Sequence, residues 1–239
     1  MRLLYDGATH QGKKRKRNED RFFARRQNDG SLLLAVADGV GGMPEGGKAA
    51  DMALEAVAVA NPNERIGPER LLQLVMHAQQ TVLRYASDKP EREGMGTTLT
   101  VAVVRDTDVL WAHVGDSRLY LLHSRELRQL TEDHRFLSSM IADGDISAEE
   151  ALGHPLRNML DQCVGCPVIE PDQGSSVLEP GDFLLLCTDG LYGEVADDSL
   201  TAILTDAVPL QRKVDLLVEA ALGNGGRDNI TLILVSAVP

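Results

Sequence analysis

Five aspartates stand at the ends of apolar stretches of the chain. They are Asp20, Asp38, Asp116, Asp189 and Asp228, and both Asp38 and Asp189 are followed by a glycine. A sheet holds the ends of its strands rigidly, and a glycine lets neighbouring backbone come close to the carboxylate. If the apolar stretches are strands, these side chains are expected to meet at one cleft.

Carboxylates without a histidine or cysteine cluster are suitable ligands for hard cations. Oxygen-only ligand sets suit Mg²⁺ or Mn²⁺ rather than zinc or copper. Several carboxylates brought together repel one another unless divalent cations neutralise them. An aspartate before a glycine is also a common turn former, so one such pair is weak evidence. Five of them at strand ends favour a metal centre.

The apolar pattern predicts runs of strands separated by helices. Strands are expected over 20–27, 31–37, 97–104, 108–114, 118–123, 127–130, 175–178, 182–188 and 229–237. Helices are expected over 49–60, from Pro68 to Tyr85, over 197–205 and over 209–222, with short helical turns at 134–143 and 147–152. Strands that come in runs, rather than alternating with helices, predict antiparallel sheets flanked by helices, an α+β fold.

Charge and cysteine usage narrow the class of protein. The 239 residues include 24 Lys and Arg against 36 Asp and Glu, a formal net charge of −12. Such a chain repels nucleic acid and anionic lipid, so neither nucleic acid nor a membrane is expected as a partner. Three cysteines, an odd number, argue against a disulfide framework and for a reducing compartment. Because the N-terminus lacks a signal-like apolar segment, we predict one cytoplasmic domain over residues 1–239, a monomer by default.

Short motifs along the chain resemble those of the bacterial metal-dependent Ser/Thr protein phosphatases of type 2C. In order they are Gly12-x-x-Arg15-x-x-Asn18-Glu19-Asp20, Ala37-Asp38-Gly39-Val40-Gly41-Gly42, Gly96-Thr97-Thr98, Gly115-Asp116-Ser117-Arg118, Thr131-x-Asp133-His134, His154-Pro155-x-Arg157-Asn158, Thr188-Asp189-Gly190 and Arg227-Asp228-Asn229. The resemblance runs from Gly12 to the last predicted strand. It implies a central antiparallel β-sandwich with helices outside each sheet, a four-layer αββα fold, and a small flap subdomain over about 131–165.

The resemblance also implies a two-metal centre that binds Mn²⁺ or Mg²⁺. Asp38 matches the ligand that bridges the two metals, and the Gly39 carbonyl matches a ligand of one of them. Asp189 and Asp228 match ligands of the other metal. Asp20 matches a direct or water-mediated contributor.

Two further residues match positions near that centre. Asp116, together with Asp189, matches a third metal position, and Arg15 matches the arginine that grips the substrate phosphate. In such a site a hydroxide between two metals attacks phosphorus, so no side-chain nucleophile is required. The implied substrates are phosphorylated Ser/Thr proteins, and the implied role is to oppose a cognate Ser/Thr kinase.

The sequence departs from the family where a general acid is expected. The position after Asp38-Gly39, a histidine in eukaryotic members, is Val40, and Met43 stands where many bacterial members have another histidine. A metal-bound water or His154 in the flap could deliver the proton instead. His154 is otherwise expected to cap or pack a flap helix before Pro155.

Two weaker signals have simple structural explanations. The five consecutive cations from Lys13 to Arg17 are by default a solvated loop, although they could draw phosphorylated segments toward an acidic centre. Cys163-x-x-Cys166 lacks the second Cys or His pair that a zinc site needs, so structural or incidental cysteines are expected.

Two rival functions stay open at this stage. A catalytically dead relative would bind phosphoproteins without hydrolysing them, although it need not retain all five aspartates. A metal-dependent phosphatase of small molecules would share the same centre, and a phosphopeptide panel separates it from a protein phosphatase.

Overall fold

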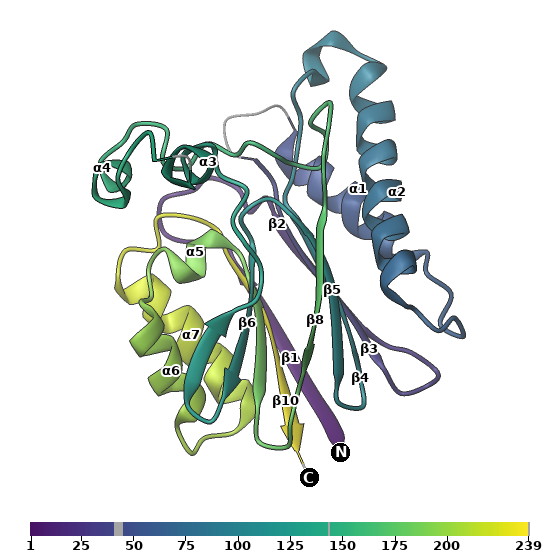
Figure 1. Cartoon of the computed structure of the whole chain (residues 1–239), viewed down its shortest axis with the longest axis vertical. Coiled ribbons are helices and arrows are strands. Elements are labelled where there is room, and N and C mark those ends of the chain that lie inside the picture. Colours follow the sequence, from purple (N-terminus) through teal and green to yellow (C-terminus); the bar gives the residue numbers. More distant parts are fainter. Residues whose placement is uncertain (41–44, 143, 239) are drawn as a thin grey trace.

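Two antiparallel sheets of five strands lie face to face in the part of the chain that the structure describes (Figure 1). The computed structural model describes residues 1–40, 45–142 and 144–238. One sheet has the order β1 (Arg2–His10), β10 (Ile230–Val238), β9 (Phe183–Cys187), β6 (Arg118–His123) and β7 (Glu126–Gln129). The other has the order β2 (Asp20–Arg26), β3 (Leu32–Asp38), β4 (Leu99–Arg105), β5 (Asp108–Val114) and β8 (Asp172–Val177).

Helices cover the outer face of each sheet. The β2–β8 sheet is covered by α1 (Gly46–Ala58) and α2 (Pro68–Ser87), which is followed by the 3₁₀ turn η1 (Pro90–Arg92). The β1–β7 sheet is covered by α5 (Asp189–Tyr192), α6 (Asp197–Thr205) and α7 (Leu210–Gly223). The short helices α3 (Phe136–Ala142) and α4 (Ala148–Leu152) lie beyond one end of the sandwich (Figure 1). The predicted α+β sandwich with helices on both sides is therefore confirmed.

Three apolar layers hold the four structural layers together. One layer lies between α1, α2 and their sheet, one between the two sheets, and one beneath α5, α6 and α7. Along β3 the odd-numbered residues from Leu33 to Ala37 pack in the first layer, and the even-numbered residues from Leu32 to Val36 pack between the sheets. A strand buried on both faces reads as a continuous apolar run, which is why β3 was predictable.

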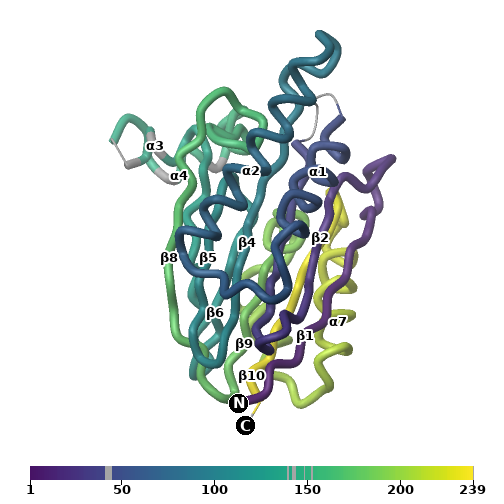
Figure 2. The backbone as a smooth tube through the Cα atoms, turned by 90° about the vertical axis from the view of Figure 1, so that its right-hand side faces the viewer, coloured from purple at the N-terminus to yellow at the C-terminus, as the bar shows by residue number. Residues whose placement is uncertain are grey.

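The strand β1 is absent from the sequence-based prediction. It is an edge strand that pairs only with β10, and Leu3 alone of its nine residues is buried. A strand with so little burial has no strict apolar alternation to detect. The start of β1 and the end of β10 lie together at the end opposite α3 and α4 (Figure 2).

Other differences from the prediction are local. The helix α1 begins at Gly46 instead of position 49, β8 covers 172–177 instead of 175–178, and α5 was not predicted. Cys163 and Cys166, expected to be structural or incidental, are joined by a disulfide, and the thiol of Cys187 is free and buried. A single domain with a flap over about 131–165 stays a prediction. No described helix combines the length and apolar character needed to cross a membrane.

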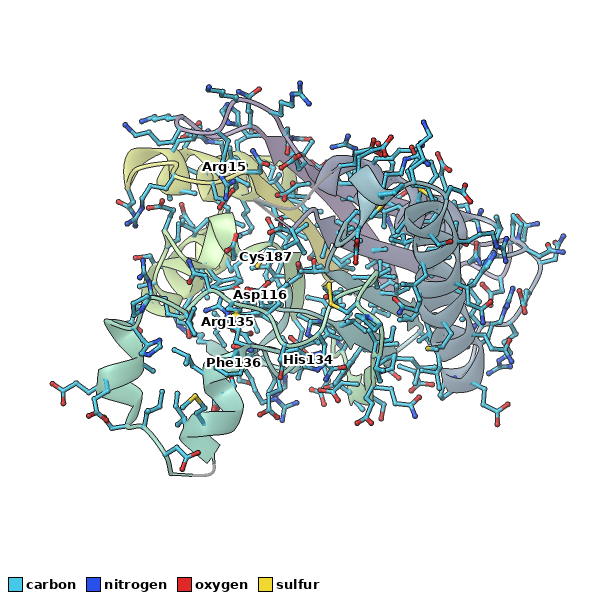
Figure 3. The ribbon with its side chains drawn as sticks, turned by 90° about the horizontal axis from the view of Figure 1, so that it is seen from above. Arg15, Asp116, His134, Arg135, Phe136 and Cys187 are labelled. Carbon is cyan, nitrogen blue, oxygen red and sulfur yellow. A yellow bond between two sulfur atoms is a disulfide. The ribbon has the colours of Figure 1, made fainter. Side chains whose placement is uncertain are left out.

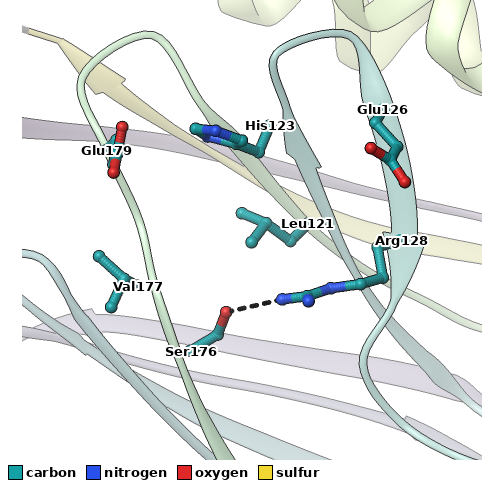
Figure 4. A pocket seen from close by; sticks show the side chains of 7 residues that line it. All are labelled: Leu121, His123, Glu126, Arg128, Ser176, Val177 and Glu179. Carbon is teal, nitrogen blue, oxygen red and sulfur yellow. Dashed lines mark hydrogen bonds between the residues drawn. The ribbon is translucent and has the colours of Figure 1, made fainter.

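A cavity of about 380 Å³ lies at one edge of the sandwich and is lined by residues of β6, β7 and β8 and by Glu179 (Figure 4). Arg128 Nη2 of β7 donates a hydrogen bond to Ser176 Oγ of β8 at 3.2 Å across this edge. None of the predicted site residues lines this cavity, so it is separate from the predicted metal site.

Candidate active site

The register of β2 against β3 places Asp20 directly opposite Asp38. Side chains opposite one another on antiparallel strands have Cβ atoms about 4.5–5.5 Å apart, and like charges there are unfavourable. Asp20 is only 1% exposed. Its Oδ2 accepts a hydrogen bond from Thr188 Oγ1 at 2.8 Å, whereas its buried Oδ1 has no hydrogen-bond partner among the described residues.

The neighbouring strands β9 and β10 supply two more carboxylates. Asp189 begins α5 immediately after β9, and Asp228 lies just before β10. Gly190 allows this proximity, because a Cβ at that position would collide with the carbonyl oxygen of Asn229. The Oδ1 atom of Asp189 is also buried without a hydrogen-bond partner among the described residues. The predicted pair therefore comes from adjacent strand ends.

Asp116 lies in the loop after β5 and is held by Arg135 and Tyr192. Its Oδ2 accepts hydrogen bonds from Arg135 Nη2 at 2.8 Å and Nε at 3.0 Å. The Tyr192 hydroxyl donates to the Asp116 carbonyl at 2.7 Å and accepts from Arg135 Nη2 at 2.8 Å. In Figure 3, which looks down on this end of the molecule, Asp116 lies between Arg15 and Arg135.

One cleft of about 420 Å³ brings most of the predicted site residues together. Its lining includes five of them: Arg15, Asp38, Asp116, Asp189 and Asp228. The remaining lining consists of Val40, Thr98, Asn158, Met159, Leu160, Cys163 and Cys166. Asp20 lies behind Asp38, and the buried Gly39 donates its N–H to the Glu19 carbonyl at 3.3 Å. All seven predicted residues are thus at this cleft or adjoin its lining.

The residues considered as proton donors do not supply a donor group to the cleft. His154 is not among the residues that line the cleft, and its Nδ1 accepts a hydrogen bond from the Leu156 N–H at 3.2 Å. This contact fits the alternative in which His154 caps a flap turn. Val40 lines the cleft with an apolar side chain. Met43 lies outside the described residues.

Burial and mutual repulsion raise the pKa values of the clustered carboxyls. Burial raises the pKa of Asp189 to about 8, with added repulsion from Asp116, Asp228 and Asp20. Burial also raises the pKa of Asp20 to about 6. The pKa of Asp38 lies well above its ordinary value because of burial and the charges of Asp20 and Asp189. A bound cation would relieve this repulsion.

The donor set fits a hard divalent cation. No group of three or more Asp, Glu, His or Cys side chains in the described ranges is placed so that it could hold a metal ion as it stands. However, the unpartnered Oδ1 atoms of Asp20 and Asp189 are buried, and buried polar atoms without partners are costly unless something binds them. The charged donors that line the cleft are carboxylate oxygens, and its two cysteines are joined in a disulfide, so Mg²⁺ or Mn²⁺ suits the site better than zinc or copper.

Arg15 occupies the exposed rim of the cleft. Its Nη2 lies 2.6 Å from Asp228 Oδ2, and its side chain is 41% exposed. A guanidinium has five N–H donors, so this ion pair leaves others free for a phosphate.

Asn229 has a positioning role that the sequence did not reveal. Its Nδ2 donates to the carbonyls of Gln11 at 2.8 Å and Arg17 at 2.9 Å, and its Oδ1 accepts from the Glu19 N–H at 2.8 Å. The loop that carries Arg15 is therefore fastened to the start of β10. Asn229 was visible as part of the Arg227-Asp228-Asn229 motif, whereas nothing in the sequence singled out Arg135.

Comparison with known proteins identifies the family to which the chain belongs. The model of the family described as Protein phosphatase 2C matches residues 6–224. Protein phosphatase PhpP of Streptococcus pneumoniae is 36% identical over 95% of each chain. The structure of Serine/threonine phosphatase Stp1 from Staphylococcus aureus is 31% identical with a TM-score of 0.92, covering 100% of this chain and 96% of that one. The catalytic domain of the serine/threonine protein phosphatase PstP, in complex with two manganese ions, is 32% identical over 99% of each chain, with a TM-score of 0.86.

Proposed function

Since the chain belongs to the protein phosphatase 2C family and is a bacterial-type serine/threonine protein phosphatase, we propose that its activity requires divalent cations. Two ions, Mn²⁺ or Mg²⁺, would bind at the carboxylate cleft. The supporting observation is the convergence of Asp38, Asp189 and Asp228 on one cleft, where the buried Oδ1 atoms of Asp189 and of the adjoining Asp20 have no hydrogen-bond partner in the described part of the chain. When bound, such ions supply a hydroxide nucleophile at neutral pH and offset charge on the phosphoryl oxygens.

Each predicted residue has a task in this proposal. Asp38 would bridge the two cations, with the Gly39 carbonyl on one and Asp189 and Asp228 on the other. Asp20, behind Asp38, would act directly or through water. Asp116, with Asp189, would hold a third cation. Because Arg135 pairs with Asp116 Oδ2, this third site would carry less negative charge than the site of the other two cations.

Arg15 would bind the phosphoryl group of the substrate. Its planar fork of donors matches phosphate oxygens, and its ion pair with Asp228 fixes where the fork stands. Because His154 lies outside the cleft, we propose that the departing serine or threonine oxygen takes its proton from water in the cleft. As the family resemblance implies, we propose that the protein acts as a monomer on phosphorylated Ser/Thr proteins and opposes a cognate Ser/Thr kinase.

The decisive experiment is hydrolysis of a phosphothreonine peptide with added Mn²⁺, with EDTA, and with an Asp189→Ala variant. We expect turnover with Mn²⁺ and its loss in both other arms, because Asp189 supplies a buried, unpartnered carboxylate oxygen. Asp215→Ala is the matched control, since Asp215 is exposed on α7 away from the cleft.

Other outcomes would favour the rival functions. Tight binding of the phosphopeptide without turnover, in a folded protein that binds Mn²⁺, would indicate a phosphoprotein-binding relative. Turnover of small phosphate esters but of no phosphopeptide in a panel would indicate a small-molecule phosphatase. Turnover that survives complete removal of divalent cations would refute the metal dependence.

A further inference from the structure

The disulfide between Cys163 and Cys166 forms a wall shared by two hollows. On one side it lines the carboxylate cleft. On the other side it lines a cavity of about 600 Å³ whose apolar lining includes Leu83, Ala86, Pro90 and Pro167. Cys163 is 6% exposed, and Cys166 is half-buried. A small thiol can therefore approach the bond through either hollow.

The turn that carries the disulfide is tied to α2. The buried side chain of Gln79 accepts a hydrogen bond from the Gly165 N–H at 2.7 Å. Its Nε2 donates to the Cys166 carbonyl at 2.6 Å. Within the turn, the Cys166 N–H donates to the Cys163 carbonyl at 2.9 Å. These hydrogen bonds therefore connect the turn to α2 independently of the bond between the two sulfur atoms.

Thr97 connects the same turn to Asp38, the residue proposed to bridge the two cations. Val164 and Thr97 exchange two backbone hydrogen bonds, each of 2.9 Å. Thr97 Oγ1 donates to the Asp38 carbonyl at 2.9 Å, and Thr97 also forms a β-bridge with Gly39. Movement of the disulfide turn would therefore be transmitted to the end of β3.

The sulfur atom of Cys163 is closely packed on the side that faces Gly96. A Cβ on Gly96 would lie 2.8 Å from Cys163 Sγ, so the sulfur already lies against the backbone of that residue. Two thiols cannot approach more closely than van der Waals contact, about 3.5–4.0 Å. Because close-packed backbone yields poorly, separated sulfur atoms must move toward the cleft or toward the second cavity.

We propose that Cys163 and Cys166 form a reversible redox site whose state sets the wall of the active cleft and thereby the binding of phosphoprotein segments; the inference rests on the proposed function. Its co-reactants are low-molecular-weight thiols and their disulfides. An external thiolate attacks Cys166 Sγ, a mixed disulfide forms, and Cys163 leaves as a thiolate that takes up a proton. A second thiol then releases Cys166, so two thiols are oxidised to one disulfide while the protein bond gains two electrons and two protons.

The test compares the fully oxidised and fully reduced protein, prepared in oxidised or reduced glutathione at a fixed free Mn²⁺ concentration. Alkylation after denaturation counts thiols: Cys187 alone reacts in the oxidised chain, and all three cysteines react in the reduced one. KM and kcat are then measured for a phosphothreonine peptide and for a small aryl phosphate. We expect the KM for the peptide to be about threefold or more higher in the reduced form, with aryl phosphate kcat within about twofold.

Two serine variants and one control complete the test. Cys163→Ser and Cys166→Ser should each show the high peptide KM of the reduced form and no response to glutathione. Cys187→Ala, which alters the buried free cysteine, should keep the response. Thermal melts confirm that each variant is folded.

The possible results distinguish failure of the redox site from failure of the proposed phosphatase function. Equal peptide KM values in both states, or three reactive thiols after oxidation, would overturn the redox site while leaving the phosphatase assignment intact. Loss of hydrolysis of both substrates in both states would contradict the proposed function instead. In that event the Kd for the phosphopeptide, measured in each state, tests the redox site, and equal values overturn it.

Discussion

The metal-free protein should become more stable when Asp189 loses its charge, even though that change destroys the proposed centre. Asp189→Asn keeps the shape of the side chain and removes the carboxylate. In the folded protein, burial and the charges of Asp116, Asp228 and Asp20 raise the pKa of Asp189 from 3.8 to about 8. Folding without metal therefore favours the protonated form of this group.

The magnitude follows from linkage between proton binding and folding. Between about pH 4 and pH 8 the folded state binds more protons at Asp189 than the unfolded state, so the free energy of unfolding falls as pH rises through this window. At pH 7 the gap from the unfolded pKa is about three units, and at about 1.4 kcal/mol per unit the upper limit is about 4 kcal/mol. Since part of Asp189 faces the cleft, where solvent screens its charge, we expect about 1–3 kcal/mol.

The assay is urea unfolding of the wild type and Asp189→Asn in EDTA at pH 5 and pH 8. The variant should be more stable at pH 8, and its advantage should shrink by about 1 kcal/mol or more at pH 5, where Asp189 of the folded wild type is protonated and uncharged. Excess Mn²⁺ should reverse the order, because an ion that binds only the folded wild type stabilises it. Asp215→Asn, an exposed carboxylate on α7, should change stability by less than about 0.5 kcal/mol at either pH.

The reasoning fails if the two proteins unfold identically in EDTA at pH 8, or if Asp189→Asn is the less stable one. Either result would mean that the Asp189 carboxylate is stabilised within the metal-free fold. Such stabilisation would need a partner other than a hydrogen-bond donor of the described residues, because none of them donates to Asp189 Oδ1.

Three further predictions concern residues around the cleft. Arg15→Lys should lower kcat/KM for a phosphopeptide about tenfold or more, because lysine lacks the planar fork; an unchanged value would remove Arg15 from phosphate binding. Asn229→Ala should lower the free energy of unfolding, measured by urea denaturation, by about 2–3 kcal/mol through three lost hydrogen bonds, and should reduce turnover; an unchanged free energy of unfolding would contradict its fastening role. Lys14→Gln with Lys16→Gln should raise KM for acidic phosphopeptides at low salt and have little effect above about 0.5 M salt, where the Debye length is short; equal effects at both salt levels would exclude steering by this loop.

The positions of Asp38, Asp189 and Asp228 along the chain were predictable because each lies at the end of a strongly apolar strand or next to one. The strand β3 is buried on both faces, so its end at Asp38 is marked by a sharp change from apolar to polar residues. The same change marks the end of β9 before Asp189 and the start of β10 after Asp228. Local sequence therefore determines where the strands end, and the carboxylates are placed by those ends.

Relations between distant segments were not predictable in the same way. Arg135 and Asp116 are separated by the strands β6 and β7, so their ion pair depends on how the chain after β7 returns to the loop after β5. The disulfide depends on whether Cys163 and Cys166 share a tight turn, and that turn is fixed by Gln79 from a helix more than eighty residues earlier. Such contacts are decided by tertiary packing rather than by local patterns.

The pairing of Asp20 with Asp38 shows why the cleft departs from ordinary folding rules. The strands β2 and β3 could avoid facing carboxylates by a shift of one residue, but such a shift would turn every apolar side chain of β3 to the opposite layer. The apolar pattern therefore fixes the register and, with it, the repulsion between the two acids. Since neighbouring strands add Asp189 and Asp228 to the same end, repulsion accumulates there instead of being relieved. A fold that holds like charges together in this way is stabilised by cations, which is why we expect metal binding and folding stability to change together in this protein.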